Sequence, residues 1–138
     1  LAQKADLILI APATANSIAK LATGICDELL TTMVLASQSQ VMIAPAMNPI
    51  MLEHAATQYN LGILQHRFRY EIIPPDVGEV ACGDWGPGKM APVEDIVLHV
   101  IARLQERSKF IGKQVLVTAG GTREPIDPVR FIGNRSSG

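Results

Sequence analysis

Hydrophobic residues along the chain gather in short continuous runs that are separated by longer segments of mixed polarity. Three runs stand out, at residues 5–12, 40–47 and 113–120, and each contains β-branched residues and ends in a turn of small residues. None of them alternates polar with apolar positions, which is typical of strands buried on both faces of a parallel sheet. A shorter strand is expected at residues 70–74, just before a glycine-rich stretch.

Helical spacing of apolar residues fills the segments between these runs. Residues 14–24 and 26–37 show this spacing between the first two runs. Residues 48–60 are expected to form the next helix, because Asn48 suits an N-cap and Pro49 suits the first helical position. At that position the missing N–H of proline leaves no hydrogen bond unmade.

The clearest helix opens at Pro92 and is expected to end near Ser108. One apolar stripe runs along it, formed by Val93, Ile96, Val97, Val100, Ile101 and Leu104. Acidic residues at its start and basic residues at its end suit the helix dipole. A domain boundary is predicted here, with residues 1–108 in a first domain, 109–112 as a linker and 113–138 at the start of a second domain.

The alternation of buried strands with helices predicts an α/β fold, a Rossmann- or flavodoxin-like parallel sheet flanked by helices. Residues 113–120 would be the first strand of a second α/β domain. Ligands of such folds bind at the carboxyl ends of the strands. Three loops follow predicted strands, APATANS (11–17), APAMNP (44–49) and TAGGTREP (118–125). The pattern therefore predicts three candidate binding loops.

Polar side chains in the first two loops allow two interpretations. Thr14, Asn16 and Ser17 open a predicted helix, where they either cap it or add hydrogen-bonding groups to a helix start that favours anions and polar ring edges. Asn48 is likewise either an N-cap or a ligand contact, and Met47 would normally fill the core. The spacing of these residues leaves both interpretations open.

The third loop matches neither a P-loop nor a GxGxxG fingerprint. Gly120 and Gly121 follow a predicted buried strand, where glycines allow a ligand to approach the backbone closely. Arg130 can supply positive charge for a phosphate group.

Residues 78–90, GEVACGDWGPGKM, hold the only tryptophan, Trp85, and one of the two cysteines, Cys82. Four glycines and a proline exclude a helix and argue against a buried strand, so the stretch is either a connector or a flap that closes over a ligand. Cys82 can give or take a proton, because a free thiol has a pKa of about 8.5. Lys89 either meets an anionic substrate or is solvated. The other cysteine, Cys26, is expected to be a small buried hydrophobic residue.

Composition excludes several classes of protein. A formal charge of −1 over 138 residues argues against a nucleic-acid binder, which would show a basic excess. No apolar run approaches the roughly 20 residues that cross a bilayer. Two cysteines make no disulfide framework, so a cytoplasmic location is expected, and the three histidines show no metal or nucleophile arrangement. Without an initiating Met, and with turn-forming residues at its end, the sequence is expected to be a fragment.

Several of these segments resemble motifs of the homo-oligomeric flavin-containing cysteine decarboxylases. APATANS resembles the PASANT motif, PAMNPIML (45–52) resembles PxMNxxMW, and ACGDWGPGKM (81–90) resembles the substrate-recognition clamp. Residues 112–138 resemble the start of the phosphopantothenate–cysteine ligase domain that is fused behind the decarboxylase in bacteria. The resemblance covers essentially the whole chain, and the motif order matches the bifunctional flavoproteins that join phosphopantothenoylcysteine decarboxylase to this ligase.

This resemblance implies an FMN-dependent enzyme of coenzyme A biosynthesis that converts 4′-phosphopantothenoylcysteine to 4′-phosphopantetheine. FMN would contact Thr14, Asn16 and Ser17. Asn48 would bind the substrate carboxylate, and Cys82 would donate the proton for the final reduction. In this family the flavin takes two electrons from the substrate and later returns them, so the net reaction is redox-neutral.

The resemblance also implies substrate contacts for Met47, Gly83 and Lys89, as the clamp folds over the substrate like an active-site lid. In the ligase part, which would use CTP and Mg, the implied active-site residues are Gly120, Gly121, Arg130 and Asn134. A homo-oligomer is expected, with a trimer-based decarboxylase and a dimeric ligase. The fragment alone is expected to be inactive, because by analogy it lacks the flavin-phosphate loop and the histidine base.

Three residues depart from the family motifs. Thr14 and Ser17 exchange the two hydroxyl residues of PASANT, and Leu52 replaces the aromatic residue that closes PxMNxxMW. Two other functions compete, a peptidyl-cysteine decarboxylase, which would not need Cys82, and a flavoprotein-like subunit that inhibits a protein phosphatase. The ligase-like residues 112–138 argue against both.

Overall fold

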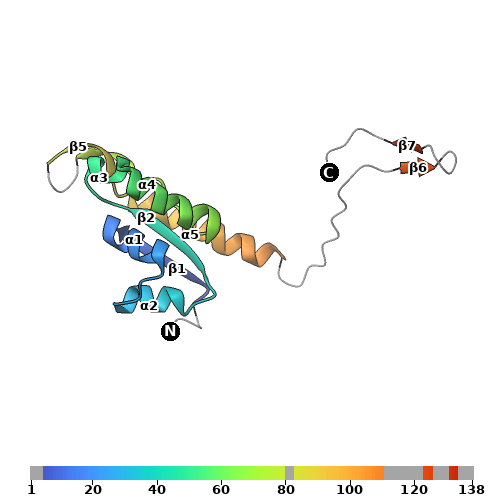
Figure 1. Cartoon of the computed structure of the whole chain (residues 1–138), viewed down its shortest axis with the longest axis horizontal. Coiled ribbons are helices and arrows are strands. Elements are labelled where there is room, and N and C mark those ends of the chain that lie inside the picture. Colours follow the sequence, from blue (N-terminus) through green and yellow to red (C-terminus); the bar gives the residue numbers. More distant parts are fainter. Residues whose placement is uncertain (1–4, 80–82, 111–122, 126–130, 134–138) are drawn as a thin grey trace. The chain divides into compact units, whose positions relative to one another are not determined.

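The chain divides into two compact units, Leu1–Ser108 and Lys109–Gly138 (Figure 1). The structure, a computed structural model, describes residues 5–79, 83–110, 123–125 and 131–133. Among these residues no helix is long and apolar enough to cross a membrane.

A three-stranded parallel sheet forms the centre of the first unit. Its strands are β1 (Leu7–Ala13), β2 (Gln40–Pro45) and β3 (Glu71–Ile72), in the spatial order β1-β2-β3. Leu7 lies opposite Gln40, and this register holds as far as Ile10 before it shifts near Ala13. In Figure 1 the β1 and β2 ribbons run side by side. The predicted parallel pairing of the first two apolar runs is therefore confirmed.

Helices cover both faces of this sheet because successive residues of a strand point to opposite sides. Val41 and Ile43 of β2 pack into one core with apolar residues of α1, α2 and the π-helical turn η2. Met42 and Ala44 pack into a second core with Ile96 of α5. Burying a side chain such as Ile43 or Met42, both fully buried, stabilises the fold by about 1.5–3 kcal/mol. The predicted α/β fold, a parallel sheet flanked by helices, is confirmed.

Most predicted helices are present with slightly different ends. The bounds are α1 Ala15–Thr23, α2 Leu29–Leu35, α3 Pro49–Glu53, α4 Ala55–Gly62, η2 Ile63–Arg67 and α5 Val93–Phe110. The single helix predicted over residues 48–60 is divided at His54, which adopts an extended conformation. The His54 Nδ1 atom accepts a hydrogen bond from Ala56 N at 3.1 Å and caps α4. A histidine can replace the usual N-cap residues here, because its ring nitrogen reaches the free N–H groups of the new helix.

Only one side of the apolar stripe of α5, the side with Ile96 and Val100, packs against the sheet. Ile96 is 4% exposed and Val100 packs beside it, whereas Val97 is 47% exposed and Ile101 is 44% exposed. Val93 is also exposed, so the stripe is wider than the strip of helix that covers the sheet. The helix ends at Phe110, two residues beyond the predicted end near Ser108.

The glycine-rich stretch forms an antiparallel hairpin of β4 (Asp76–Glu79) and β5 (Trp85–Lys89). The sequence argued against a buried strand in this stretch, and that expectation is wrong for β5, in which Gly86 and Gly88 are buried. Gly78 pairs with Gly86 at the middle of the hairpin, and both are buried. Glycines occur in this strand because the backbone of β5, which has no side chains at these positions, packs directly against the neighbouring segment.

In the second unit β6 (Arg123–Pro125) and β7 (Phe131–Gly133) form a two-stranded antiparallel sheet. The strand predicted at residues 113–120 lies outside the described residues.

Candidate functional site

Two of the predicted binding loops meet at the carboxyl edge of the sheet. β1 leads into the loop that opens α1, and β2 leads into the loop that opens α3. Ala46 N donates a hydrogen bond to Ala13 O at 3.0 Å, which ties the second loop to the first. Parallel neighbours end at the same edge, so the predicted FMN residues and Asn48 start from adjacent strands.

The side chains at the start of α1 form a small polar cluster. Thr14 is the N-cap, and its Oγ1 accepts a hydrogen bond from Ser17 N at 3.3 Å. The hydroxyl groups of Thr14 and Ser17 lie 3.1 Å apart and share a hydrogen bond. Asn16 is exposed beside them. The capping role that the sequence allowed is therefore present, and it leaves the Asn16 amide at the surface.

This cluster fits one part of FMN better than another. Hydroxyl and amide groups can donate to and accept from the polar edge of a flavin ring. Residues 11–19 contain no lysine or arginine, so this loop offers no side-chain cation for the FMN phosphate. The start of α1 therefore suits contacts with the ring rather than with the phosphate group.

Asn48 follows β2 directly, and both ends of its side-chain amide are engaged. Its Oδ1 accepts a hydrogen bond from Ile50 N at 2.9 Å and caps α3, whose first residue is Pro49. Its Nδ2 donates a hydrogen bond to the carboxylate of Asp84. Asn48 is partly buried and Asp84 is exposed. The cap thus directs the amide N–H₂ group toward the hairpin.

Strand β5 is docked on the segment that carries Asn48. Met47 N donates to Gly88 O at 3.0 Å. A Cβ atom on Gly88 would lie 2.3 Å from Met47 O, and one on Gly86 would lie 2.9 Å from Pro49 Cγ. Both glycines are required by this close approach of two backbones. Hairpin and Asn48 loop therefore form one site.

The remaining predicted substrate residues are spread along this contact. Met47 is partly buried at the docked segment, and Lys89 is exposed one residue beyond Gly88. Gly83 has a positive φ of 85° and leads into Asp84. Trp85 begins β5 and is 76% exposed.

Several predicted site residues lie outside the described residues. They are Cys82, Gly120, Gly121, Arg130 and Asn134. Their proposed roles rest on the sequence motifs. The other cysteine, Cys26, is exposed, so the expectation of a small buried residue is wrong. It lies between α1 and α2, directly before Asp27 and Glu28, whose exposed carboxylates pair with Lys20 at the surface.

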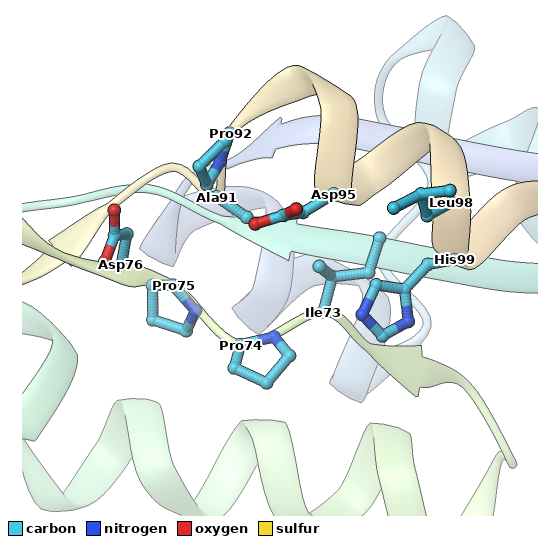
Figure 2. A pocket seen from close by; sticks show the side chains of 9 residues that line it. All are labelled: Ile73, Pro74, Pro75, Asp76, Ala91, Pro92, Asp95, Leu98 and His99. Carbon is cyan, nitrogen blue, oxygen red and sulfur yellow. The ribbon is translucent and has the colours of Figure 1, made fainter.

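A cavity of about 330 Å³ lies apart from these predicted residues (Figure 2). Residues 73–76 form one side and the start of α5 forms the other. Asp76, Asp95 and His99 contribute its polar groups. His99 Nδ1 also lies 3.5 Å from Glu71 Oε1. None of the predicted site residues that the structure describes lines the cavity.

Sequence reasoning missed Asp84. It stands in the quoted motif between Gly83 and Trp85, yet nothing in the local pattern links it to a residue 36 positions earlier. The signal that could have found it is chemical. A carboxylate within a glycine-rich turn needs donors, and an amide at the end of a neighbouring strand can provide them.

Known proteins match the chain along its whole length. A coenzyme A biosynthesis bifunctional protein CoaBC from Vibrio cholerae is 50% identical over 138 residues, which are 100% of this chain and 34% of that protein. A cysteine/cysteine sulfinic acid decarboxylase from an unknown prokaryotic organism is 52% identical over 137 residues, which are 96% of this chain and 38% of that protein. The chain thus spans about a third of the length of these curated relatives.

Solved structures share the fold. A cysteine-to-serine mutant of PPC decarboxylase complexed with pantothenoylaminoethenethiol has a TM-score of 0.67 and 35% identity, over 74% of this chain and 56% of that one. The epidermin biosynthesis protein EpiD from Staphylococcus aureus has a TM-score of 0.62 and 36% identity, over 72% of this chain and 59% of that one.

Two family models divide the chain between them. The model described as "DNA/pantothenate metabolism flavoprotein C-terminal domain" matches residues 110–138. The model described as "Flavoprotein" matches residues 1–105, which contain the sheet, the polar cluster of α1 and the Asn48 loop. By this match, the chain belongs to the flavoprotein family.

Proposed function

We propose that the full-length protein is an FMN-dependent decarboxylase of coenzyme A biosynthesis, which converts 4′-phosphopantothenoylcysteine to 4′-phosphopantetheine. The observation that carries this proposal is the side chain of Asn48, which lies just beyond the carboxyl end of β2. Its amide donates a hydrogen bond to the Asp84 carboxylate. An amide in this position is suited to the carboxylate of a cysteine-derived substrate. The 50% identity to a bifunctional CoaBC protein supports the pathway.

Different residues of the chain bind the flavin and the substrate. Thr14, Asn16 and Ser17 contact the flavin ring, and Asn48 orients the substrate carboxylate that leaves as carbon dioxide. When bound, FMN supplies a two-electron acceptor that later returns the electrons, so the oxidation and reduction of the substrate balance. The net change replaces a carbon–carboxylate bond with a carbon–hydrogen bond. The proton that this needs is assigned to the Cys82 thiol.

The docked hairpin completes the substrate side of the site. Met47 and Gly83 border the substrate at the contact between the Asn48 loop and β5, and Lys89 meets its anionic phosphate. The solved complex of the PPC decarboxylase mutant supports this chemistry, since its ligand, pantothenoylaminoethenethiol, is a cysteine-derived thiol without its carboxylate.

The second unit belongs to a ligase that joins cysteine to 4′-phosphopantothenate with CTP and Mg. We assign Gly120, Gly121, Arg130 and Asn134 to that active site, on the sequence motif and on the family match to residues 110–138. We further propose a cytoplasmic homo-oligomer, with a trimeric arrangement of decarboxylase domains and a dimeric ligase.

One experiment tests the decarboxylase. Full-length protein with bound FMN is mixed anaerobically with 4′-phosphopantothenoylcysteine, free cysteine or cysteine sulfinic acid, and carbon dioxide and product mass are followed. We expect the highest kcat/KM for 4′-phosphopantothenoylcysteine. Preference for cysteine or cysteine sulfinic acid, the substrates in the name of the 52% identical relative, would replace the proposed substrate. The variant Asn48→Asp, which replaces the amide with a carboxylate, should lose decarboxylation, and Asn60→Asp, on α4, is its matched control.

A further inference from the structure

The bond between Asn48 and Asp84 raises a question about the site. Asn48 Oδ1 is committed to the cap of α3, so the ligand-binding part of this amide is its N–H₂ group. That group donates to a carboxylate of the chain itself. The protein thus places one of its own carboxylates on the amide that is proposed to hold the carboxylate of the substrate.

The position of Asp84 is set by the hairpin as well as by this hydrogen bond. Gly88 and Met47 are joined by a backbone hydrogen bond of 3.0 Å, and the glycines of β5 lie against the segment 47–49. Asp84 directly precedes β5. Docking of the strand therefore places the Asp84 carboxylate beside Asn48.

A substrate carboxylate and Asp84 cannot share this amide without repulsion. Two carboxylates that accept from one amide nitrogen carry like charges a few ångströms apart, and a protein site disfavours such a pair. Asp84 is exposed, so its carboxylate can turn toward water when a ligand takes its place. A buried carboxylate would lack this alternative.

We propose that Asp84 is an internal carboxylate ligand of Asn48, which the carboxylate of the substrate displaces on binding. This inference rests on the proposed role of Asn48. Asp84 then weakens the binding of ligands that carry a carboxylate and leaves the binding of the decarboxylated product unchanged. Asp84 is therefore a specificity-determining residue, because it lowers the affinity for ligands with a carboxylate relative to the affinity for the product.

The test uses Asp84→Asn in the full-length protein with bound FMN. The amide keeps the shape of the side chain and removes its charge. For an exposed pair of charges about 4 Å apart, loss of the repulsion should lower the KM for 4′-phosphopantothenoylcysteine about fivefold. The inhibition constant of 4′-phosphopantetheine, which has no carboxylate, should not change.

Glu79→Gln is the matched control. Glu79 lies on β4 opposite Trp85, so this variant removes one negative charge from the same hairpin without touching the Asn48 bond. Its KM should remain that of the wild type. Asp84→Ala is the second variant, and it should lower KM in the same direction as Asp84→Asn. Neither KM nor the product inhibition constant depends on the amount of folded enzyme, so a partial loss of folding does not alter this comparison.

The outcomes separate this inference from the proposed function. A raised or unchanged KM for both Asp84 variants, in an enzyme that decarboxylates the substrate, overturns the internal-ligand role. A raised KM would mean that Asp84 positions Asn48, and an unchanged KM would mean that Asp84 has no effect on substrate binding. An equal drop in KM for Glu79→Gln also overturns it, because the effect would then belong to the charge of the hairpin as a whole. Absence of decarboxylation by the wild-type enzyme removes the proposed function instead.

Discussion

Replacing Gly88 with alanine tests whether the docked hairpin is essential. The Gly88 φ is +132°, a conformation that residues with a side chain rarely adopt, and its added Cβ would lie 2.3 Å from Met47 O. Such backbone strain costs about 1–3 kcal/mol. Overlap with a packed neighbour costs about 1–3 kcal/mol more. The contact atom is a backbone carbonyl, which cannot rotate away as the end of a flexible side chain would.

The expected cost is therefore about 2–6 kcal/mol if β5 stays docked. Undocking of the hairpin sets the upper limit, because the chain can avoid the overlap by giving up the Met47–Gly88 hydrogen bond. Either way the Asn48 site opens. We expect Gly88→Ala to lower the midpoint of thermal unfolding of the full-length protein and to reduce kcat/KM for the substrate by at least tenfold.

Two other glycines supply graded controls. Gly24 also has a positive φ, of +74°, but nothing lies within 4 Å of its added Cβ, so Gly24→Ala should cost only about 1–2 kcal/mol of conformational energy. Gly62 is helical and equally open, so Gly62→Ala should be neutral or stabilising by up to about 1 kcal/mol. Calorimetry ranks the three variants within one protein. A Gly88→Ala protein no less stable than Gly24→Ala, with normal kcat/KM, would refute the reasoning.

Three further predictions address individual side chains. Asn48→Asp should leave the flavin oxidised and the substrate intact under anaerobic mixing, because a second carboxylate repels that of the substrate at short range, and substrate turnover by this variant would contradict the carboxylate-binding role. Cys82→Ser should still release carbon dioxide but leave the flavin reduced, because a serine hydroxyl is a far weaker acid than a thiol, whereas normal 4′-phosphopantetheine formation would exclude Cys82 as the proton donor. The pKa of Asp27 is lowered mainly by its hydrogen bond from Lys20, 2.8 Å away, so this pair adds stability above the ordinary carboxyl pKa of Asp27 and loses it as the pH falls through the lowered pKa. Lys20→Met should return the pKa of Asp27 toward its ordinary value in an NMR titration, and an unchanged pKa would show that Lys20 is not the cause.

The sheet could be predicted from the sequence because its signal is local. Continuous apolar runs such as those of β1 and β2 are typical of strands in a parallel sheet between helices. β2 is buried on both faces, whereas Leu9 of β1 is 38% exposed. Capping could be stated as one of two interpretations of Thr14 and Asn48 for the same reason, since a cap acts on its own helix.

Features that depend on distant partners could not be predicted in this way. The stretch with Gly86 and Gly88 looks unable to form a strand until the Met47–Pro49 segment is placed beside it. Asp84 gains its meaning from an amide 36 residues earlier in the chain. The break at His54 depends on a ring nitrogen taking the place of a backbone acceptor, which periodicity does not reveal.

Strand β2 is paired on both sides, by β1 and by β3, and all its residues except Gln40 are buried. Amides in such a strand exchange with deuterium only when a large part of the domain opens, whereas those of a two-stranded exposed hairpin exchange through local opening. Asn48 follows the slowly exchanging strand within three residues, and Asp84 precedes the strand of the hairpin. The hydrogen bond between them therefore joins the most protected part of the unit to one of its least protected parts. Ligand exchange at this site can then proceed by fluctuation of the hairpin alone, with Asn48 held in place.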